Sequence, residues 1–242
     1  MKILALETSA KSVSAAVTED GRVLASGYLD TGLTHSRTLM PIVQAMLKNA
    51  DLSISDCDAI AVAAGPGSFT GIRIGISAAK GLAFAANLPA VGVSTLEGMA
   101  QGLAHIDDAL FVCSMDARRN QVYNALFTAQ DSHLNRLTPD RAISLEALAD
   151  EVCRDTSKIN QIILAGDGAN LCLKAFQDRG IHCRLAPPQL LLQNAISVAL
   201  CAERIMQAGK SVSPQELAPI YLRPPHAQTL RERQEHAINL PG

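Results

Sequence analysis

Two acidic residues occupy matching places in the two halves of the chain. Glu7 follows the apolar segment 3–6, and Asp116 follows the apolar segment 110–115. An acid at the tip of the first hairpin in each of two lobes can hold Mg²⁺ and the phosphates of a nucleotide in the cleft between the lobes. These two positions therefore indicate nucleotide chemistry as the first hypothesis.

The turns that follow these acids are poorly suited to a phosphate. Neither residues 7–12 nor residues 116–119 contain a glycine that would let the backbone approach closely, and the second turn carries two bulky arginines. A weakened or abandoned nucleotide cleft is one interpretation, and hairpin turns that merely favour small and polar residues are the other. Together with a third polar turn, the candidate cleft residues are Glu7, Thr8, Ser9, Asp116, Arg118, Gly166, Asp167 and Gly168.

A glycine-rich string stands at residues 65–75, which read Gly-Pro-Gly-Ser-Phe-Thr-Gly-Ile-Arg-Ile-Gly after the apolar run 59–64. This pattern predicts a strand, a sharp turn and a helix capped by Ser68 or Thr70. The string is neither a Walker loop nor a dinucleotide fingerprint, so a structural turn and an anion site both stay open. Ser68 lacks a Gly-x-Ser-x-Gly elbow and an assignable histidine base, which leaves serine hydrolysis a minor alternative.

The histidines and cysteines give little support to metal or redox chemistry. The six histidines are dispersed with no His-x-x-x-His pair, and the six cysteines stand singly with no Cys-x-x-Cys pair. We therefore predict no metal site and no cofactor beyond weak or shared nucleotide binding. The cysteines are interpreted as reduced thiols of a cytosolic protein.

Length and composition describe a folded chain. Its 242 residues are 48% hydrophobic and 18% charged, enough for one large domain or two lobes. A net charge of −2 and 3% aromatic residues argue against autonomous nucleic-acid binding, which needs clustered cations and stacking platforms. Glu7 interrupts the apolar start and no other run reaches spanning length, so we expect a cytoplasmic protein with no membrane segment.

The order of predicted elements repeats along the chain. Three strands, a helix and a strand are expected from residue 3, and the same order returns after about residue 105. The helix over 36–49 tolerates Pro41 if it begins near Thr38. We predict an α/β protein of two lobes with mixed sheets. Its parts are a first lobe at 1–104, a second lobe at 105–190, a helix at 191–209 that could cross back to the first lobe, and a tail at 210–242 that is flexible beyond Pro214.

The helices expected at 36–49 and 70–87 carry a second candidate site. Small residues on the later helix would let another helix pack at short distance, and the earlier helix adds larger apolar residues. If both helices are partly exposed they form an association surface, whereas the alternative is that they only cover their own sheet. The candidate interface residues are Leu39, Val43, Met46, Gly71, Ile72, Arg73, Gly75, Ile76 and Ala79.

Several segments together resemble the TsaB family, also called YeaZ, of bacterial proteins required to make threonylcarbamoyladenosine in tRNA. The matching segments are distinctive and span nearly the whole chain: 3–9, 34–41, 65–75, 92–96, 116–123 and 219–223. The chain departs from the family at Glu7, where the family commonly has Asp. That departure places the carboxylate one methylene further out and weakens any metal-bridging role.

The resemblance implies a duplicated actin-like, Hsp70-like fold of the ribonuclease H type, and a pairing with the related transferase subunit TsaD. The metal-binding histidine pair of TsaD falls on Thr95 and Met99 here, neither of which suits a hard catalytic metal. The resemblance further implies docking of the ATPase TsaE on the pair and a homodimer in the absence of TsaD. Contact with tRNA is then expected only through the complex.

We therefore expect a non-catalytic subunit that supports TsaD through the two helices, with homodimer and heterodimer competing for one surface. A Gly75→Leu substitution is expected to weaken TsaD binding, and unchanged affinity in a titration, with the fold intact, would contradict this. The alternatives are an ATP-dependent phosphotransferase of the actin-like superfamily and, third, a peptidase.

Overall fold

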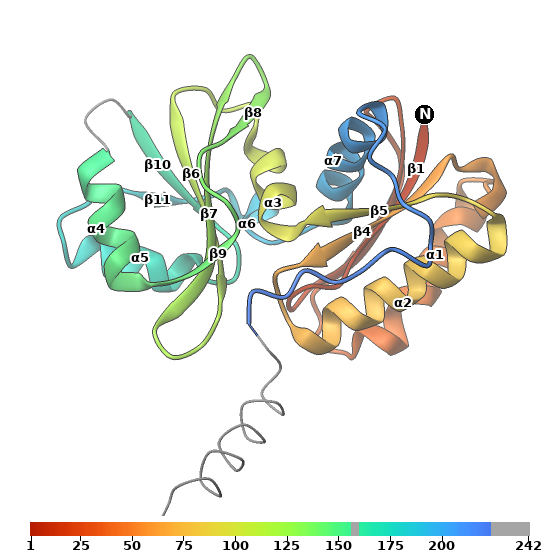
Figure 1. Ribbon diagram of the computed structural model, residues 1–242, viewed down its shortest axis with the longest axis horizontal. Helices are drawn as coiled ribbons and strands as arrows, with labels where there is room; N and C mark the ends of the chain where they lie inside the picture. The colour runs from red at the N-terminus through yellow and green to blue at the C-terminus, as the bar shows by residue number, and fades with distance from the viewer. Residues whose placement is uncertain (156–159, 224–242) are drawn as a thin grey trace, which may run out of the picture.

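A computed structural model of the chain describes residues 1–155 and 160–223, and it consists of two lobes side by side, each built on one sheet (Figure 1). The first sheet contains β1 (Lys2–Glu7), β2 (Val13–Glu19), β3 (Arg22–Leu29), β4 (Ala59–Gly65) and β5 (Ala90–Ser94). The second sheet contains β6 (Ala109–Asp116), β7 (Gln121–Gln130), β8 (His133–Arg136), β9 (Arg141–Ser144), β10 (Gln161–Ala165) and β11 (Arg184–Leu185).

The two sheets repeat one topology. The strand order is β3-β2-β1-β4-β5 in the first sheet and β8-β7-β6-β10-β11 in the second, where β9 also pairs with β7. In both sheets the first three strands pair with one another antiparallel, and the last two extend the sheet in parallel. A central parallel strand is buried on both faces, which explains why β4 is an unbroken apolar run. The predicted α/β fold of two lobes with mixed sheets is confirmed.

Two helices cover one face of the first sheet. α1 (His35–Asn49) and α2 (Phe69–Ala86) bury their apolar sides in its core, and the short 3-10 helix η1 (Ile54–Asp56) lies between them in the chain. α1 begins at His35 rather than near Thr38, so Pro41 lies inside the helix. Because proline has no N–H, the carbonyl of Arg37 loses its usual helical partner. Arg37 and Pro41 are exposed, so water can satisfy that carbonyl.

The last helix of each lobe packs on the other lobe. α3 (Thr95–Leu103) follows β5 but buries its apolar side against the second sheet, and α7 (Ala195–Gln207) follows the second sheet but packs on the first. The two helices contact each other between the lobes (Figure 1). The lobe boundary predicted at residue 104 therefore falls near residue 94. Hydrophobic contact, and not chain order, decides which sheet a helix covers.

The other face of the second sheet is covered by α4 (Leu145–Asp155) and α5 (Ala169–Gln177), and α6 (Pro188–Leu191) leads into α7.

A charge network holds α3 between the lobes. Glu97 of α3 lies 2.8 Å from the guanidinium of Arg136 on β8 and 3.7 Å from that of Arg204 on α7. Arg136 also pairs with Asp140 at 2.6 Å. One acid thus joins the second sheet to the helix that covers the first.

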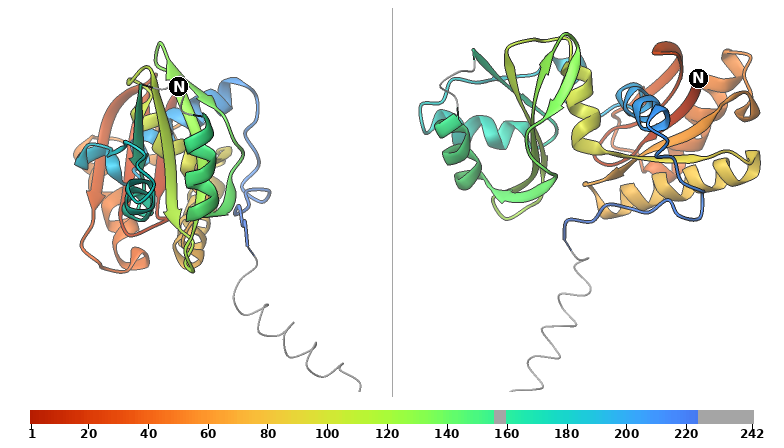
Figure 2. Two further views of the ribbon diagram at one scale, coloured as in Figure 1. Left: turned by 90° about the vertical axis from the view of Figure 1, so that its left-hand side faces the viewer. Right: turned by 45° about the horizontal axis from the view of Figure 1, so that its top comes forward.

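Residues 211–223, which we call the strap, run back along the first lobe. Val212 forms a bridge with Ala90, Leu217 is 3% exposed in the core, and the N–H of Ile220 donates to the carbonyl of Ala64 at 2.7 Å. Figures 1 and 2 show this blue segment following α2 toward the region between the lobes.

The prediction of a flexible tail beyond Pro214 is wrong up to residue 223, because apolar residues scattered among polar ones anchor the strap. The rest of the predicted tail, 224–242, lies outside the described residues. Within the described part of the chain, every helix is too short or too polar to cross a membrane.

Candidate functional site

The two acids identified in the sequence end the corresponding strands β1 and β6, and each is used inside its own turn. Glu7 is 1% exposed, and its Oε1 accepts a hydrogen bond from the N–H of Ser9 at 2.5 Å. Asp116 Oδ1 accepts from the N–H of Arg118 at 2.7 Å, and the Arg118 guanidinium lies 3.3 Å from Oδ2. In both turns an acid therefore binds the amide two residues later, where a phosphate would need a free N–H group.

The turn after β1 is also closed by the start of α2. Thr8 Oγ1 donates to the carbonyl of Gly71 at 2.8 Å, and the carbonyl of Ser9 accepts from the N–H of Ser68 at 2.7 Å. A Cβ at Gly67 would collide with Ser9 and would lie 3.1 Å from Cε of Met115 in the second lobe. Because Gly67 has no side chain, the turn after β4 can pack closely against both the turn after β1 and Met115 of the second lobe.

The glycine string forms the predicted strand, turn and helix. Ser68 caps α2, and its Oγ accepts from the N–H of Gly71 at 3.3 Å. His35 Nε2 is bonded to the carbonyl of Ala10 at 2.7 Å. No hydrogen bond within the described residues joins Ser68 to a histidine. Ser68 is therefore placed as a helix cap, without the base that a serine nucleophile needs.

The turn at 166–168 lies against β6 in the second lobe. The N–H of Gly168 donates to the carbonyl of Ser114 at 3.1 Å, and the N–H of Gly166 donates to the carbonyl of Leu191 at 2.6 Å. A Cβ at Gly166 would collide with the carbonyl of Ser114. These glycines therefore fit the turn against β6 and the segment before α7, and their amides are bonded within the chain.

Burial changes the acidity of two of the candidate carboxyls. Burial raises the pKa of Glu7 to about 7, and the negative charge of Asp167 adds to that shift. Burial likewise raises the pKa of Asp167, whose Oδ1 has no hydrogen-bond partner among the described residues. Asp116 lies close enough to act on Asp167. The structure thus brings the three acids together, yet across residues 1–155 and 160–223 no group of three or more His, Cys, Asp or Glu side chains could hold a metal ion.

The structure places eight of the nine candidate interface residues inside the first lobe. Arg73 alone is exposed; the buried residues are Leu39, Val43, Met46, Gly71, Ile72, Gly75, Ile76 and Ala79. The apolar pattern of an amphipathic helix marks the side that meets its own sheet, so the sequence selected the inward sides of α1 and α2. For these eight residues, the alternative that they cover their own sheet is what the structure shows.

Gly75 packs against the turn after β1 and against β4, so a substitution there cannot test partner binding alone. A Cβ at this position would collide with Thr8 Oγ1 and would lie 3.1 Å from a methyl group of Val62. Gly75→Leu therefore cannot test partner binding by itself, because a larger side chain must displace the turn after β1.

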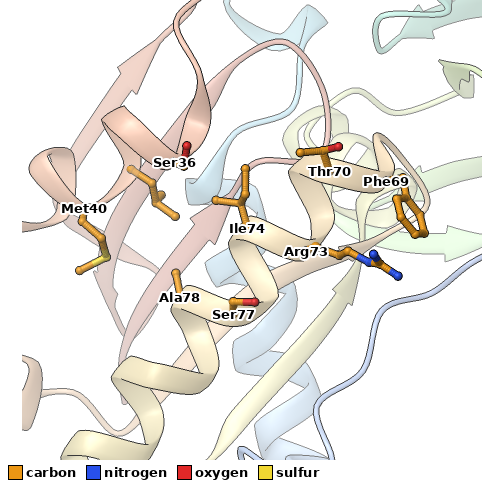
Figure 3. Close-up of a pocket in the computed structure, with 9 residues that line it drawn as sticks. Ser36, Met40, Phe69, Thr70, Arg73, Ile74, Ser77 and Ala78 are labelled. Carbon is orange, nitrogen blue, oxygen red and sulfur yellow. The ribbon is translucent and has the colours of Figure 1, made fainter.

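A groove, which we call the helical groove, runs between the outward sides of α1 and α2 and also reaches the buried Leu39. Its lining is apolar or hydroxyl-bearing except for one cation, and consists of Ser36, Leu39, Met40, Phe69, Thr70, Arg73, Ile74, Ser77 and Ala78. Figure 3 shows Met40 and Ser36 on α1 across from Ile74 on α2, with Phe69 and Arg73 on the opposite side of α2. Phe84 is 70% exposed two turns beyond Ser77 and extends the apolar surface along α2.

The strap supplies one rim of the helical groove. The Tyr221 ring stacks on Phe69 with 5.1 Å between centroids, and its hydroxyl accepts from Nε of Arg73 at 3.0 Å. The Arg73 guanidinium lies 3.7 Å above the Phe69 ring. Arg223 then donates to the carbonyl of Ala117 at 2.8 Å, so the strap also reaches the second lobe. Reasoning from the sequence did not select Tyr221 as a site residue; the signal available was an aromatic residue in a chain with few of them.

Comparison with known proteins gives matches over most of the chain. The model of the family "TsaD: tRNA N6-adenosine threonylcarbamoyltransferase" matches residues 30–229. The Escherichia coli (strain K12) "tRNA threonylcarbamoyladenosine biosynthesis protein TsaB" is 33% identical over 224 residues, which cover 92% of this chain and 95% of that protein.

Two solved structures also resemble the chain closely. YeaZ from Pseudomonas aeruginosa has a TM-score of 0.76 at 31% identity, covering 91% of this chain and 99% of that one. A second Pseudomonas aeruginosa structure, described as an uncharacterized protein with similarity to peptidase YEAZ, has a TM-score of 0.79 at 30% identity. That alignment covers 92% of this chain and 99% of the other.

Proposed function

Because the chain belongs to the TsaB family of tRNA threonylcarbamoyladenosine biosynthesis proteins, we propose that it is a non-catalytic subunit that binds and supports the transferase TsaD. The match to the TsaD family model supports this pairing, since two chains of one fold can associate through equivalent elements. In the proposed assembly the ATPase TsaE docks on the pair, and tRNA is reached only through the complex. The proposed location is the cytoplasm.

The helical groove is the observation that carries this proposal. Its lining combines apolar and hydroxyl side chains with a single cation, and Phe84 continues the apolar surface along α2. Contiguous apolar surface of this kind on a folded protein is typical of a protein interface. The interface proposed here therefore uses the two helices predicted from the sequence, but their outward rather than their inward sides.

The turns at 7–12, 116–119 and 166–168, together with α3, support the non-catalytic part of the proposal. The amides of Ser9, Arg118 and Gly168 are bonded within the chain, and an acid occupies two of those bonds. Thr95 and Met99, which stand where TsaD is expected to carry metal-binding histidines, are 1% and 3% exposed in the structure. Met99 packs in the core of the second lobe. Residues at these positions therefore serve packing and turn formation.

Binding to TsaD from the same organism tests the pairing. Ser77→Trp adds bulk at an exposed position of the helical groove without touching the core, and Ala147→Trp makes a comparable change at an exposed position on α4. In a calorimetric titration, Ser77→Trp should raise Kd by at least about tenfold, whereas Ala147→Trp should leave it unchanged. Equal affinity of both variants and the unaltered chain would contradict this interface.

Catalysis by the isolated chain separates the proposal from the phosphotransferase alternative. We expect no ATP turnover above the buffer rate with Mg²⁺ present, and no saturable nucleotide binding as tight as that of an efficient ATPase. Turnover that disappears in Asp116→Asn, with the folded state retained, would favour the phosphotransferase.

A further inference from the structure

The two helices that line the helical groove, α1 and α2, carry charge of one sign. α1 and α2 contain Arg37, Lys48, Arg73 and Lys80, and neither helix contains an Asp or a Glu. Three of these side chains are exposed and Lys80 is half-buried. The whole chain has 23 acidic and 21 basic residues, so the cationic character is local to this face and is not a property of the average surface.

These four cations are not neutralised by the described part of the chain. The nitrogen of Lys80 donates to a backbone carbonyl, that of Gln215, at 3.1 Å, and Arg73 is held by an aromatic ring and a hydroxyl. Ion pairs among the described residues use other cations, such as Lys2 with Glu19 at 3.5 Å and Arg141 with Glu151 at 2.9 Å. Of the nearest acids along the chain, Asp51 follows the end of α1, and the Glu216 carboxylate on the strap is bonded to Ser213.

Arg73 is the cation best placed to act on a partner. Its guanidinium is fixed on the rim of the helical groove by Phe69 and Tyr221, so little side-chain entropy remains to be lost on binding. Nε is used in the bond to Tyr221, which leaves the two terminal nitrogens for a carboxylate of the partner. Figure 3 shows the guanidinium extended away from the axis of α2.

We propose that this cationic face selects a partner whose helical face carries carboxylates, and that it disfavours a second copy of this chain. The inference rests on the proposed function and names the property by which the partner is recognised. In a two-fold symmetric homodimer built on the same face, α1 and α2 of each copy meet the same two helices of the other. Four cations of one copy would then face four of the other, and the Glu216 carboxylate on each strap is already bonded to Ser213, whereas an acidic partner would meet complementary charge.

Salt dependence gives the first test. Between about 50 and about 300 mM NaCl, the Kd of the full chain for TsaD should rise by at least about threefold, because screening weakens attraction between opposite charges. Self-association of the full chain, measured by analytical ultracentrifugation without TsaD, should strengthen or stay constant over the same range. Self-association that weakens with salt, or TsaD binding indifferent to salt, would overturn the inference.

Charge reversal gives the second test. Arg73→Glu should weaken TsaD binding by at least about tenfold and should strengthen self-association, because the new acid faces the cations of the other copy. Arg73→Gln should weaken TsaD binding less and should leave self-association near its original strength. The matched control is Lys174→Glu, at an exposed position on α5 of the second lobe, which should alter neither equilibrium.

The outcomes separate this inference from the proposed function. If the unaltered chain binds TsaD and Arg73→Glu binds equally well, the pairing stands and the charge selection fails. If the unaltered chain does not bind TsaD at any salt concentration, the pairing fails, and the self-association arm decides the charge selection alone. In that arm, equal self-association of Arg73→Glu and the unaltered chain would overturn it.

Discussion

Gly71 and Gly81 lie on the same helix, α2, and show how differently two glycines can be used. A Cβ at Gly71 would collide with the carbonyl of Thr8, whose hydroxyl donates to the carbonyl of Gly71 at 2.8 Å. A Cβ at Gly81 would meet no atom within 4 Å. Gly71 is therefore required for close contact with the turn after β1, whereas the position of Gly81 has room for a side chain.

This contrast gives a matched pair of substitutions. Gly71→Ala should lower the free energy of unfolding by roughly 1–3 kcal/mol, because the added methyl group overpacks against the turn. Gly81→Ala should raise it by up to about 1 kcal/mol, since alanine favours a helix over glycine. Urea unfolding followed by circular dichroism measures both, and a stable Gly71→Ala variant would refute the close contact.

Glu7 is the other residue whose behaviour follows from its surroundings. Its pKa is about 7 in the folded chain and 4.5 when exposed, so the folded state binds a proton between those values that the unfolded state does not. The stability that this carboxyl contributes is therefore fully present below about pH 4.5 and is lost as the pH rises to about 7.

Glu7→Gln should remove that pH dependence, because glutamine mimics the protonated acid and can still accept from the N–H of Ser9. The variant should gain stability over the unaltered chain above pH 7, by up to about 3 kcal/mol, and the difference should shrink toward pH 5. Thermal unfolding at both pH values measures it. Parallel pH profiles for the two proteins would show that Glu7 is ionised in the fold like an exposed acid.

At the scale of elements, the strap shows that a polar stretch can be an integral part of a fold. Leu217 lies in the core of the first lobe, the N–H of Ile220 bonds to β4, and Tyr221 forms the rim of the helical groove. None of these contacts is local, since each joins the strap to residues more than a hundred positions earlier. The helical groove and its rim are therefore assembled from three elements, α1, α2 and the strap.

Truncation of the strap side chains tests its role in stability. Leu217→Ala should lower the free energy of unfolding by about 2–4 kcal/mol, because it leaves a cavity in the core. Ile220→Ala should cost clearly less, since Ile220 is 36% exposed and its backbone bond to Ala64 is kept. Denaturant unfolding of both variants decides this, and a neutral Leu217→Ala would mean that the strap is not a folded part of the lobe.

At the scale of the whole molecule, the lobes are joined by the exchange of α3 and α7. A Cβ at Gly98 would lie 3.6 Å from a methyl group of Val198, and one at Gly102 would lie 3.1 Å from Oγ of Ser197. The two helices thus meet along small residues of α3, and each is buried against the sheet of the opposite lobe. Unfolding of α3 would expose the second sheet, and unfolding of α7 would expose the first. We therefore expect the two lobes to unfold in a single transition.

A bulky residue at this seam should destabilise both lobes together. Gly102→Leu should lower stability by roughly 1–3 kcal/mol and raise amide hydrogen exchange in both β1 and β6, whereas Gly98→Ala, with ordinary van der Waals contact, should be tolerated. Exchange followed by mass spectrometry measures the two strands separately. Faster exchange confined to one lobe would contradict the coupling.

The sequence by itself determined the local features of this protein. Apolar runs and turn residues located the strands, the glycine turn with its Ser68 cap and the helices, because such patterns depend on neighbours a few positions away. The repeated order of elements was sufficient for the duplicated fold. The same reasoning found Glu7, Asp116 and Asp167, but it could not show that two of these acids bind amides in their own turns.

Only the tertiary structure decided which surfaces are free. An apolar residue such as Ile72 marks a buried side of α2 in the sequence, but only its contact with the first sheet shows that Arg73 and Ser77 face outward. The assignment of α3 to the second sheet and the anchoring of Leu217 likewise depend on residues far apart in the chain. The hydrophobic effect is non-directional, because an apolar side chain gains from burial against any apolar surface. The sequence pattern therefore indicates that a side chain is buried, and only the three-dimensional fold shows which residues it packs against.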